Sequence, residues 1–132
     1  MFLFHPLTTH FPIALWVTSF LFDILSWRRR HPLHSTIALY LIGLGLLAAP
    51  MAIATAWVDY LRLLQEGVGG PFMNLHFVHS ILSYGTTAFY LGSFLLRWRA
   101  SLSPSAQLAL GLMGALLISA TGWYGGELLR TM

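Results

Sequence analysis

The sequence predicts an all-α integral membrane protein: one four-helix up-down bundle that uses residues 1–132 as a single domain. The chain is 57% hydrophobic and only 8% charged. Its mean hydropathy of +0.71 is higher than a water-soluble domain of this length can bury. Four long apolar segments fill most of the chain, and every basic residue is an arginine placed near the end of such a segment.

Each apolar segment is long enough to cross a membrane. The segments cover residues 11–27, 36–58, 75–96 and 106–124. As helices of about 17 to 23 residues they span roughly 25 to 35 Å, which matches a hydrocarbon core of about 30 Å. No basic residue precedes the first segment, so we expect it to remain in the mature protein and not to be cleaved as a signal peptide.

The arginines predict the orientation. Those that follow the first and third segments are Arg28, Arg29, Arg30, Arg97 and Arg99, whereas only Arg62 and Arg130 lie on the other side. Basic residues favour the cytoplasmic side, so we predict a multi-pass protein with both termini outside. The arginines form no patch with interleaved aromatic residues, which argues against nucleic-acid binding. We expect Asp23 to pair with Arg28 or its neighbours.

Short motifs recur in the two halves of the chain. Residues 54–62 read ATAWVDYLR and residues 120–130 read ATGWYGGELLR, and the dipeptide HF occurs at 10–11 and again at 76–77, with the same offset. A duplication would relate two helical hairpins by an axis along the membrane normal and set histidines of the first and third segments diagonally opposite. Matches this short also arise by chance in apolar sequence, so an internal repeat stays open.

The histidines are the main candidate ligands, because four of them lie where the first and third segments begin. These are His5, His10, His76 and His79. In an up-down bundle they share one level with the ends of the other two segments, which carry Asp59, Arg62, Glu127 and Arg130. A polar stripe at helical spacing continues from the histidines along the third segment through Ser83, Thr86 and Tyr90. Such a stripe faces the interior of a bundle. His31 and His34 fall at the opposite end, where we expect solvated loop residues.

Small residues are placed to pack helices closely or to leave space for a flat ligand. On the fourth segment they are Gly111, Ala115, Ser119, Gly122 and Gly126, and on the second they are Ala48, Ala52 and Thr55, followed by Asp59. Asp59 and Glu127 each precede an arginine by three residues, so we expect Asp59–Arg62 and Glu127–Arg130 pairs along a helix face.

Imidazole binds zinc, copper and haem iron, so spacing has to discriminate among them. A closed zinc site needs four converging ligands, which His76 and His79, with His5 or His10 and a carboxylate from Asp59 or Glu127, would permit. Low-spin haem needs two histidines across the core, an apolar slot and cations near its propionates. We predict haem b with His10 and His79 as axial ligands and with Arg62 and Arg130 at the rim. His5 or His76 is the alternative ligand, and zinc or copper is the alternative cofactor.

Several motifs together resemble a known family. They are HPLTTHFPIALW at the start, Asp23, WVDYLR ending the second segment, His79, and the closing GWYGGELL. This pattern is similar to a family of small bacterial integral membrane proteins catalogued as domain of unknown function twenty-two thirty-one. The resemblance implies four membrane helices, a prokaryotic inner membrane and an association with redox partners, since relatives occur fused to Rieske-type domains.

By the same motif match, the residues of the family's outer cluster are His5, His10, Asp59, His79 and Glu127. The resemblance supplies no established activity. Family members commonly continue after the GGELL-like stretch with His-Gly, whereas here Arg130, Thr131 and Met132 follow. If that histidine is a ligand in the family, we expect that either His76 substitutes for it or one site is missing.

Two functions remain open at this stage. The first is a b-type cytochrome, an electron-transfer protein more than a stand-alone enzyme, that relays electrons between a quinol or other membrane partner and an external redox protein. The second is a non-redox metal-binding protein or a structural subunit of a membrane complex. Either one contacts lipid and is compatible with a homo- or hetero-oligomer. No phosphate loop, nucleophile–base motif or metalloprotease motif points to a hydrolase.

Overall fold

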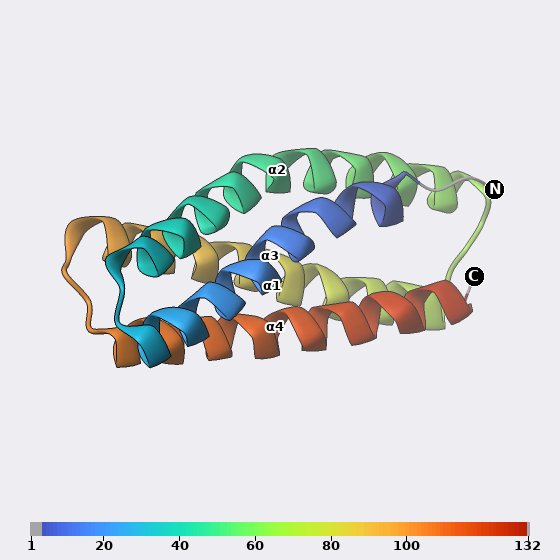
Figure 1. Cartoon of the computed structure of the whole chain (residues 1–132). Helices are drawn as coiled ribbons and strands as arrows, with labels where there is room; N and C mark the ends of the chain where they lie inside the picture. The colour runs from blue at the N-terminus through green and yellow to red at the C-terminus, as the bar shows by residue number, and fades with distance from the viewer. Residues whose placement is uncertain (1–3, 132) are drawn as a thin grey trace.

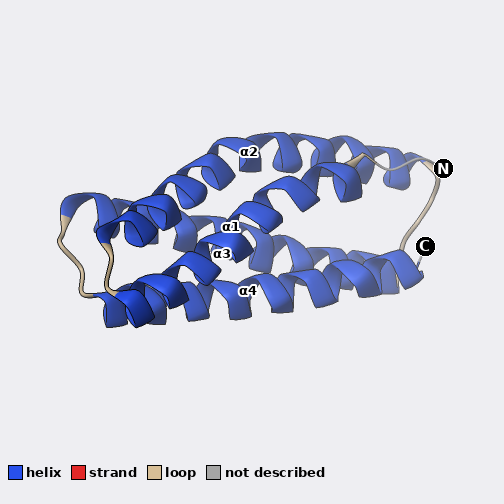
Figure 2. Cartoon of the chain, in the orientation of Figure 1, coloured by secondary structure: helices blue, strands red, loops and turns tan. Residues whose placement is uncertain are grey.

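The computed structural model describes residues 4–131 and folds them into four long helices. These are α1 (His5–Arg29), α2 (Pro32–Gln65), α3 (Pro71–Arg99) and α4 (Pro104–Thr131). No strand occurs in this described part (Figure 2). Three helices, α1, α2 and α4, are long and apolar enough to cross a membrane. The predicted all-α four-helix fold is therefore confirmed, and α3 differs from the others by the polar stripe that it carries.

The helices extend beyond the predicted apolar segments because their limits are set by backbone signals. A proline lies in the first turn of every helix, where its missing N–H costs nothing; these prolines are Pro6, Pro32, Pro71 and Pro104. Helix α1 ends at Arg30, which adopts a left-handed conformation (φ 52°) and donates its N–H to the carbonyl of Ser26. Two glycines with positive φ, Gly67 and Gly70, make the turn between α2 and α3.

The helices form an up-down bundle in which α1 lies diagonally opposite α3 (Figure 1). Helix α1 packs on α2 and α4, and α3 packs on α4 and, less closely, on α2. We call the end where α1 begins and α4 ends the terminal end, and the opposite end, with the α1–α2 and α3–α4 loops, the arginine end (Figure 1). The predicted diagonal placement of the first and third segments is confirmed.

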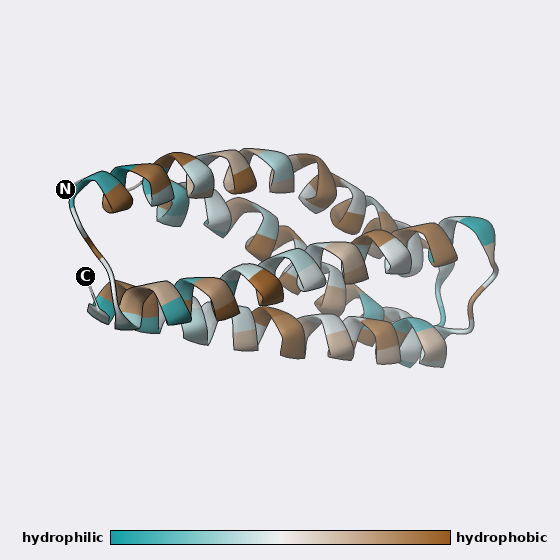
Figure 3. Cartoon of the chain, turned by 180° about the vertical axis from the view of Figure 1, so that it is seen from behind, coloured by the Kyte–Doolittle hydropathy of each residue, from teal (hydrophilic) through white to brown (hydrophobic). Residues whose placement is uncertain are grey.

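Aromatic stacking across this diagonal forms the centre of the core. The rings of Trp16 and Tyr90 stack with centroids 4.3 Å apart and planes 9° from parallel. They pack with Ile42, Ala49 and Ile118. A Cβ atom added at Gly114 would lie 2.5 Å from the Tyr90 hydroxyl oxygen, so this helix contact requires glycine. Apolar residues cover the helices along their length, and the most hydrophilic residues lie mainly toward the two ends (Figure 3).

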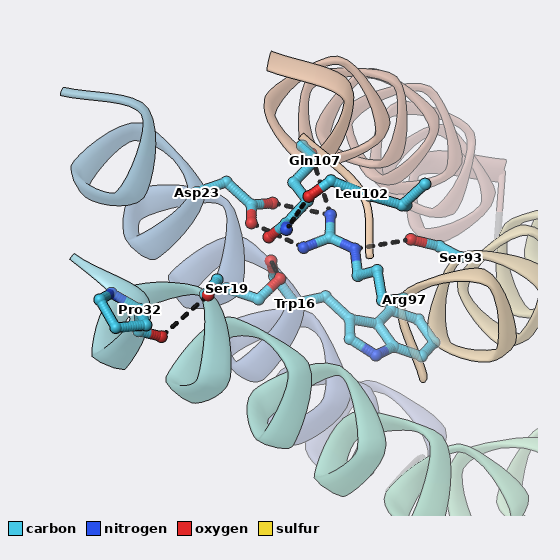
Figure 4. A network of polar contacts seen from close by, with 9 residues as sticks. Trp16, Ser19, Asp23, Pro32, Ser93, Arg97, Leu102 and Gln107 are labelled. Atoms are coloured by element: carbon cyan, nitrogen blue, oxygen red, sulfur yellow. Dashed lines mark hydrogen bonds and ion pairs between the residues drawn. The ribbon is translucent and has the colours of Figure 1, made fainter. Parts of the chain in front are cut away.

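A buried ion pair joins α1 to α3 near the arginine end (Figure 4). Arg97 donates to both carboxylate oxygens of Asp23, at 2.6 and 2.9 Å, and the two side chains are 3% and 0% exposed. The guanidinium also donates to Ser93 Oγ at 3.2 Å and to the Gln107 carbonyl at 3.0 Å. The expectation that Asp23 pairs with Arg28 is wrong. Residues five apart point about 140° apart around a helix, so Asp23 faces the interior while Arg28 is exposed.

Candidate functional site

A cavity of about 440 Å³ opens among the four helices in the half of the bundle near the terminal end. Of the predicted site residues, those that line it are His5, His10, Asp59, His76 and His79. The polar stripe of α3 faces it as expected, since Ser83 and Thr86 line it too. Arg62, Glu127 and Arg130 are at the same end but do not line the cavity. His31 and His34 lie far from it at the arginine end, where the His31 ring accepts a hydrogen bond from the Leu33 N–H.

Two histidine rings meet across the diagonal of the bundle. The ring centroids of His5 and His79 are 6.1 Å apart, with planes at 77°. His5 Nδ1 lies 2.8 Å from the carbonyl of Ala52 on α2, and His79 Nδ1 lies 3.1 Å from the carbonyl of Thr121 on α4. Because a carbonyl can only accept, each Nδ1 carries the proton and each Nε2 keeps its lone pair. The bonds fix both rings in the form that binds a metal.

His10 lies apart from this pair. Its side chain is exposed, and its Nδ1 bonds to the carbonyl of Pro6 in its own helix. His5 and His10 are five residues apart and so point about 140° apart around α1. The structure thus brings His5, and not His10, to the ring of His79.

His76 occupies the wall of the cavity between α2 and α3. Its ring stacks on the Tyr60 ring with centroids 4.3 Å apart. The Phe72 ring is a second neighbour, with its centroid 5.7 Å from that of His76. The hydrogen bond between its Nδ1 and Ser80 Oγ is long, 3.5 Å. His76 is therefore held by ring packing, and its nitrogens are only weakly engaged.

Asp59 caps the start of α1 from the neighbouring helix. Its Oδ2 accepts the backbone N–H of His5 at 2.7 Å, where a carboxylate also meets the positive end of the helix dipole. Its Oδ1 is buried and has no hydrogen-bond partner among residues 4–131. The expected Asp59–Arg62 pair is wrong, because the carboxylate points inward toward α1. Arg62 instead lies over the Phe4 ring, 5.1 Å from its centroid.

The other expected surface pair is confirmed. Arg130 donates to Glu127 Oε1 at 2.8 Å, and the arginine side chain is 75% exposed. The two arginines expected near haem propionates therefore have contacts of their own at the rim.

Small residues hold the cavity open. Ala49, Ala52 and Ala56 line it from α2, and Gly122 and Gly126 line it from α4. A Cβ atom added at either glycine would meet no other atom within 4 Å. Not all of the predicted stripe serves this purpose, since Gly111 packs against Asp23 and Ser119 is exposed. The predicted association of small residues with free space therefore applies near the terminal end.

A closed metal site is not formed by these side chains. Within residues 4–131 no three or more His, Asp or Glu side chains converge on a point that could hold a metal ion. The site offers two facing imidazoles and a large apolar volume.

The spacing of the interior residues of α1 is a sequence signal that favours His5. The interior positions of α1 are Pro12, Trp16, Ser19, Asp23 and Ser26. The spacing between these positions alternates between four and three residues. The same spacing, extended toward the N-terminus, includes His5 and does not include His10. This stripe also indicates that Asp23 faces the core and needs a partner from another helix.

Comparisons with known proteins identify the family alone. No curated protein and no solved structure matches the chain. A family model described as "Predicted membrane protein (DUF2231)" matches residues 3–132. Because this match spans nearly the whole sequence, the chain belongs to the DUF2231 family of membrane proteins.

Proposed function

We propose that this protein is a b-type cytochrome that binds haem b in the cavity near the terminal end, with His5 and His79 as axial ligands. Bound haem would supply one-electron redox chemistry at its iron. The protein would relay electrons between a membrane partner, such as a quinol, and a redox protein outside the membrane.

The facing histidine pair is the observation that carries this proposal. Two imidazoles bound on opposite sides of one metal ion, at metal–nitrogen distances of about 2.0 to 2.1 Å, have ring centroids roughly 6 Å apart. The separation of the His5 and His79 rings is 6.1 Å. Both Nδ1 atoms donate to backbone carbonyls, which orients the rings and leaves Nε2 as the ligand atom. Asp59 acts as a positioning residue, because it holds the backbone of His5.

The cavity fits a large flat group better than a bare ion. Its volume of about 440 Å³ lies within the usual range of roughly 300–1,000 Å³ for small-molecule sites. Alanines of α2 and glycines of α4 form part of its wall and occupy little of the space. Zinc or copper alone would leave most of this volume unfilled and would find only two imidazoles.

Charges at the rim fit haem less well. Arg130 is paired with Glu127, so Arg62 is the cation left for the haem carboxylates on this side. The unpartnered oxygen of Asp59 would repel a carboxylate placed beside it. Arg62 is therefore the residue that would hold haem carboxylates, and Asp59 would not.

We also propose a prokaryotic inner membrane with both termini outside. Arg28, Arg29, Arg30 and Arg99 gather at the arginine end, as expected of the cytoplasmic side. A reporter fused after residue 132 should be active outside the cytoplasm. Activity confined to the cytoplasm would reverse the orientation and place the histidines inside.

The spectrum of the purified protein tests the cytochrome proposal. Protein from haem-replete cells should be red, with a Soret band and an α band that sharpens on reduction with dithionite. His5→Ala and His79→Ala should each abolish or convert this spectrum, because each removes an axial ligand. His10→Ala should retain it, which separates the two histidines of α1.

His31→Ala is the matched control, since that histidine lies at the arginine end and should not affect the spectrum. A colourless protein that contains stoichiometric zinc or copper would replace haem with a metal site. A protein with neither would support the structural-subunit alternative. Loss of the spectrum in His10→Ala but not in His5→Ala would return the axial role to His10.

A further inference from the structure

We infer that a groove between α2 and α3 binds the headgroup of a membrane quinone or quinol. The groove has a volume of about 220 Å³ and lies beside the main cavity. Its lining includes Trp57 and Tyr60 from α2 and His76, Phe77, Ser80 and Tyr84 from α3. It is formed where two neighbouring helices pack least closely. The size suits a single quinone ring and is too small for haem.

The groove is reached from the lipid. Trp57, Phe77 and Tyr84 are 53%, 66% and 45% exposed, and in a membrane-embedded bundle this exposed surface faces lipid chains. A ligand with an isoprenoid tail can therefore place its ring in the groove and leave its tail in the bilayer. No passage through the aqueous ends of the bundle is needed.

The polar groups of the groove match the two oxygens of a quinone ring. Tyr84 Oη accepts the indole N–H of Trp57 at 3.0 Å, and its own O–H has no acceptor among residues 4–131. The His76 ring has only its long contact with Ser80. A lipid acyl chain in this place would leave these groups without partners, which is costly in hydrocarbon. A quinone carbonyl or quinol hydroxyl provides a partner for each.

The aromatic side chains favour a flat ring over other polar lipids. Trp57 and Tyr60 contact edge to face, with centroids 5.9 Å apart, and Tyr60 stacks on His76. Flat faces of this kind pack best against another flat ring. Phosphate headgroups would gain little here, since the groove contains no cationic side chain.

The position of the groove links it to the histidine pair. Tyr60, His76 and Tyr84 line both the groove and the main cavity, so one layer of rings separates the two. Quinone binding at the groove depends on these residues alone, whereas its use as the place where electrons enter rests on the proposed function. The two claims can therefore fail separately.

Quenching of tryptophan fluorescence tests the groove directly, because quinones quench an indole that they contact. A short-tailed benzoquinone is titrated into the protein in phospholipid nanodiscs. We expect saturable quenching that disappears in Trp57→Phe and persists in Trp98→Phe, whose ring is exposed at the arginine end. His76→Phe keeps an aromatic ring but removes the proposed hydrogen bond to the quinone, and it should weaken quinone binding about tenfold. Tyr84→Phe should weaken it several-fold, and His31→Phe should not change it.

Tyr84→Phe keeps the test valid if His76→Phe does not fold. The absence of saturable quenching in the unmodified protein would overturn the proposal. So would quenching that survives Trp57→Phe but is lost in Trp16→Phe, since Trp16 lines the main cavity. Colourless protein that binds quinone in the groove would support this site and contradict the cytochrome. Red protein that binds no quinone would support the cytochrome and contradict the quinone site in the groove.

Discussion

The two halves of the bundle treat their buried carboxylates in opposite ways. From the Trp16–Tyr90 stack to the arginine end, the packed half, the Asp23 carboxylate receives both of its hydrogen bonds from Arg97. From that stack to the terminal end, the open half, one oxygen of Asp59 has no partner, and the His5 and His79 rings line an open volume. Both halves belong to the same four helices.

Under the proposed function, this difference separates stability from function along the helix axes. In the packed half, Gly114 allows close contact, because a Cβ atom there would collide with Tyr90. In the open half, Gly122 and Gly126 lie against free space. Close packing without voids is what stabilises a protein interior. An open volume beside an unpartnered carboxylate oxygen persists at a cost to stability; under the proposed function, a ligand fills it.

The largest effect should come from breaking the ion pair of the packed half. Arg97→Met leaves the Asp23 carboxylate buried without a partner and should lower the free energy of unfolding by about 3–5 kcal/mol. Unfolding in detergent micelles measures this loss. The double variant Asp23→Leu/Arg97→Met should regain most of it, because both charges are gone. A double variant as unstable as Arg97→Met would mean that packing, and not the charge, is responsible.

The second-largest effect should come from adding a methyl group at one glycine in each half of the bundle. Gly114→Ala forces the Tyr90 hydroxyl to move and should cost about 1–3 kcal/mol. In Gly122→Ala the added methyl group meets no atom, so the free energy of unfolding should not change, although the cavity becomes narrower. Parallel unfolding measurements on the two variants make the comparison. Equal losses would show that the open half is as tightly packed as the other.

The cap on α1 should give a smaller effect within the open half. Asp59→Ala removes the acceptor for the His5 N–H and should cost about 0.5–2 kcal/mol. Asp59→Asn retains an oxygen acceptor and should be close to neutral in stability. Circular dichroism during unfolding measures both. A large loss in Asp59→Asn would instead assign the stabilisation to the negative charge.

The smallest effect is expected at the exposed pair of the terminal end. Glu127→Gln removes the ion pair with Arg130 and should change the free energy of unfolding by about 0.2–0.5 kcal/mol. Raising the salt concentration should remove this difference, because exposed pairs are screened. A salt-independent loss of more than about 1 kcal/mol would contradict the exposed geometry.

Local patterns in the sequence were sufficient to predict the elements of this fold. The apolar lengths predicted the helices, and the polar stripe of α3 predicted which of its faces looks inward. The helix limits were predicted less well, because the prolines at Pro32, Pro71 and Pro104 were not used as start signals. Each of these prolines starts its helix through its own backbone geometry, so its effect on the helix limit does not depend on distant parts of the chain.

Contacts between helices were predicted less well, because they depend on how each helix is rotated. Asp23 was assigned to a neighbour in sequence, and its partner Arg97 is 74 positions away. The sequence favours His10 as the ligand from α1, whereas the rotation of the helix brings His5 to His79, because the two histidines point about 140° apart. The hydroxyl pair of Thr8 and Thr55, 2.6 Å apart, also depends on that rotation. No single-helix pattern contains such information unless the interior stripe is traced through Trp16 and Asp23.

The Asp23–Arg97 pair also bears on how the chain is made. Asp23 belongs to the first hairpin, and Arg97 belongs to the second, which leaves the ribosome later. Until α3 arrives, the first hairpin has a lone carboxylate near the arginine end of α1, and an unpaired charge in a membrane segment is costly. A chain truncated after α2 should therefore insert poorly and be degraded. The ion pair would then make a completed chain more stable in the membrane than an unfinished one.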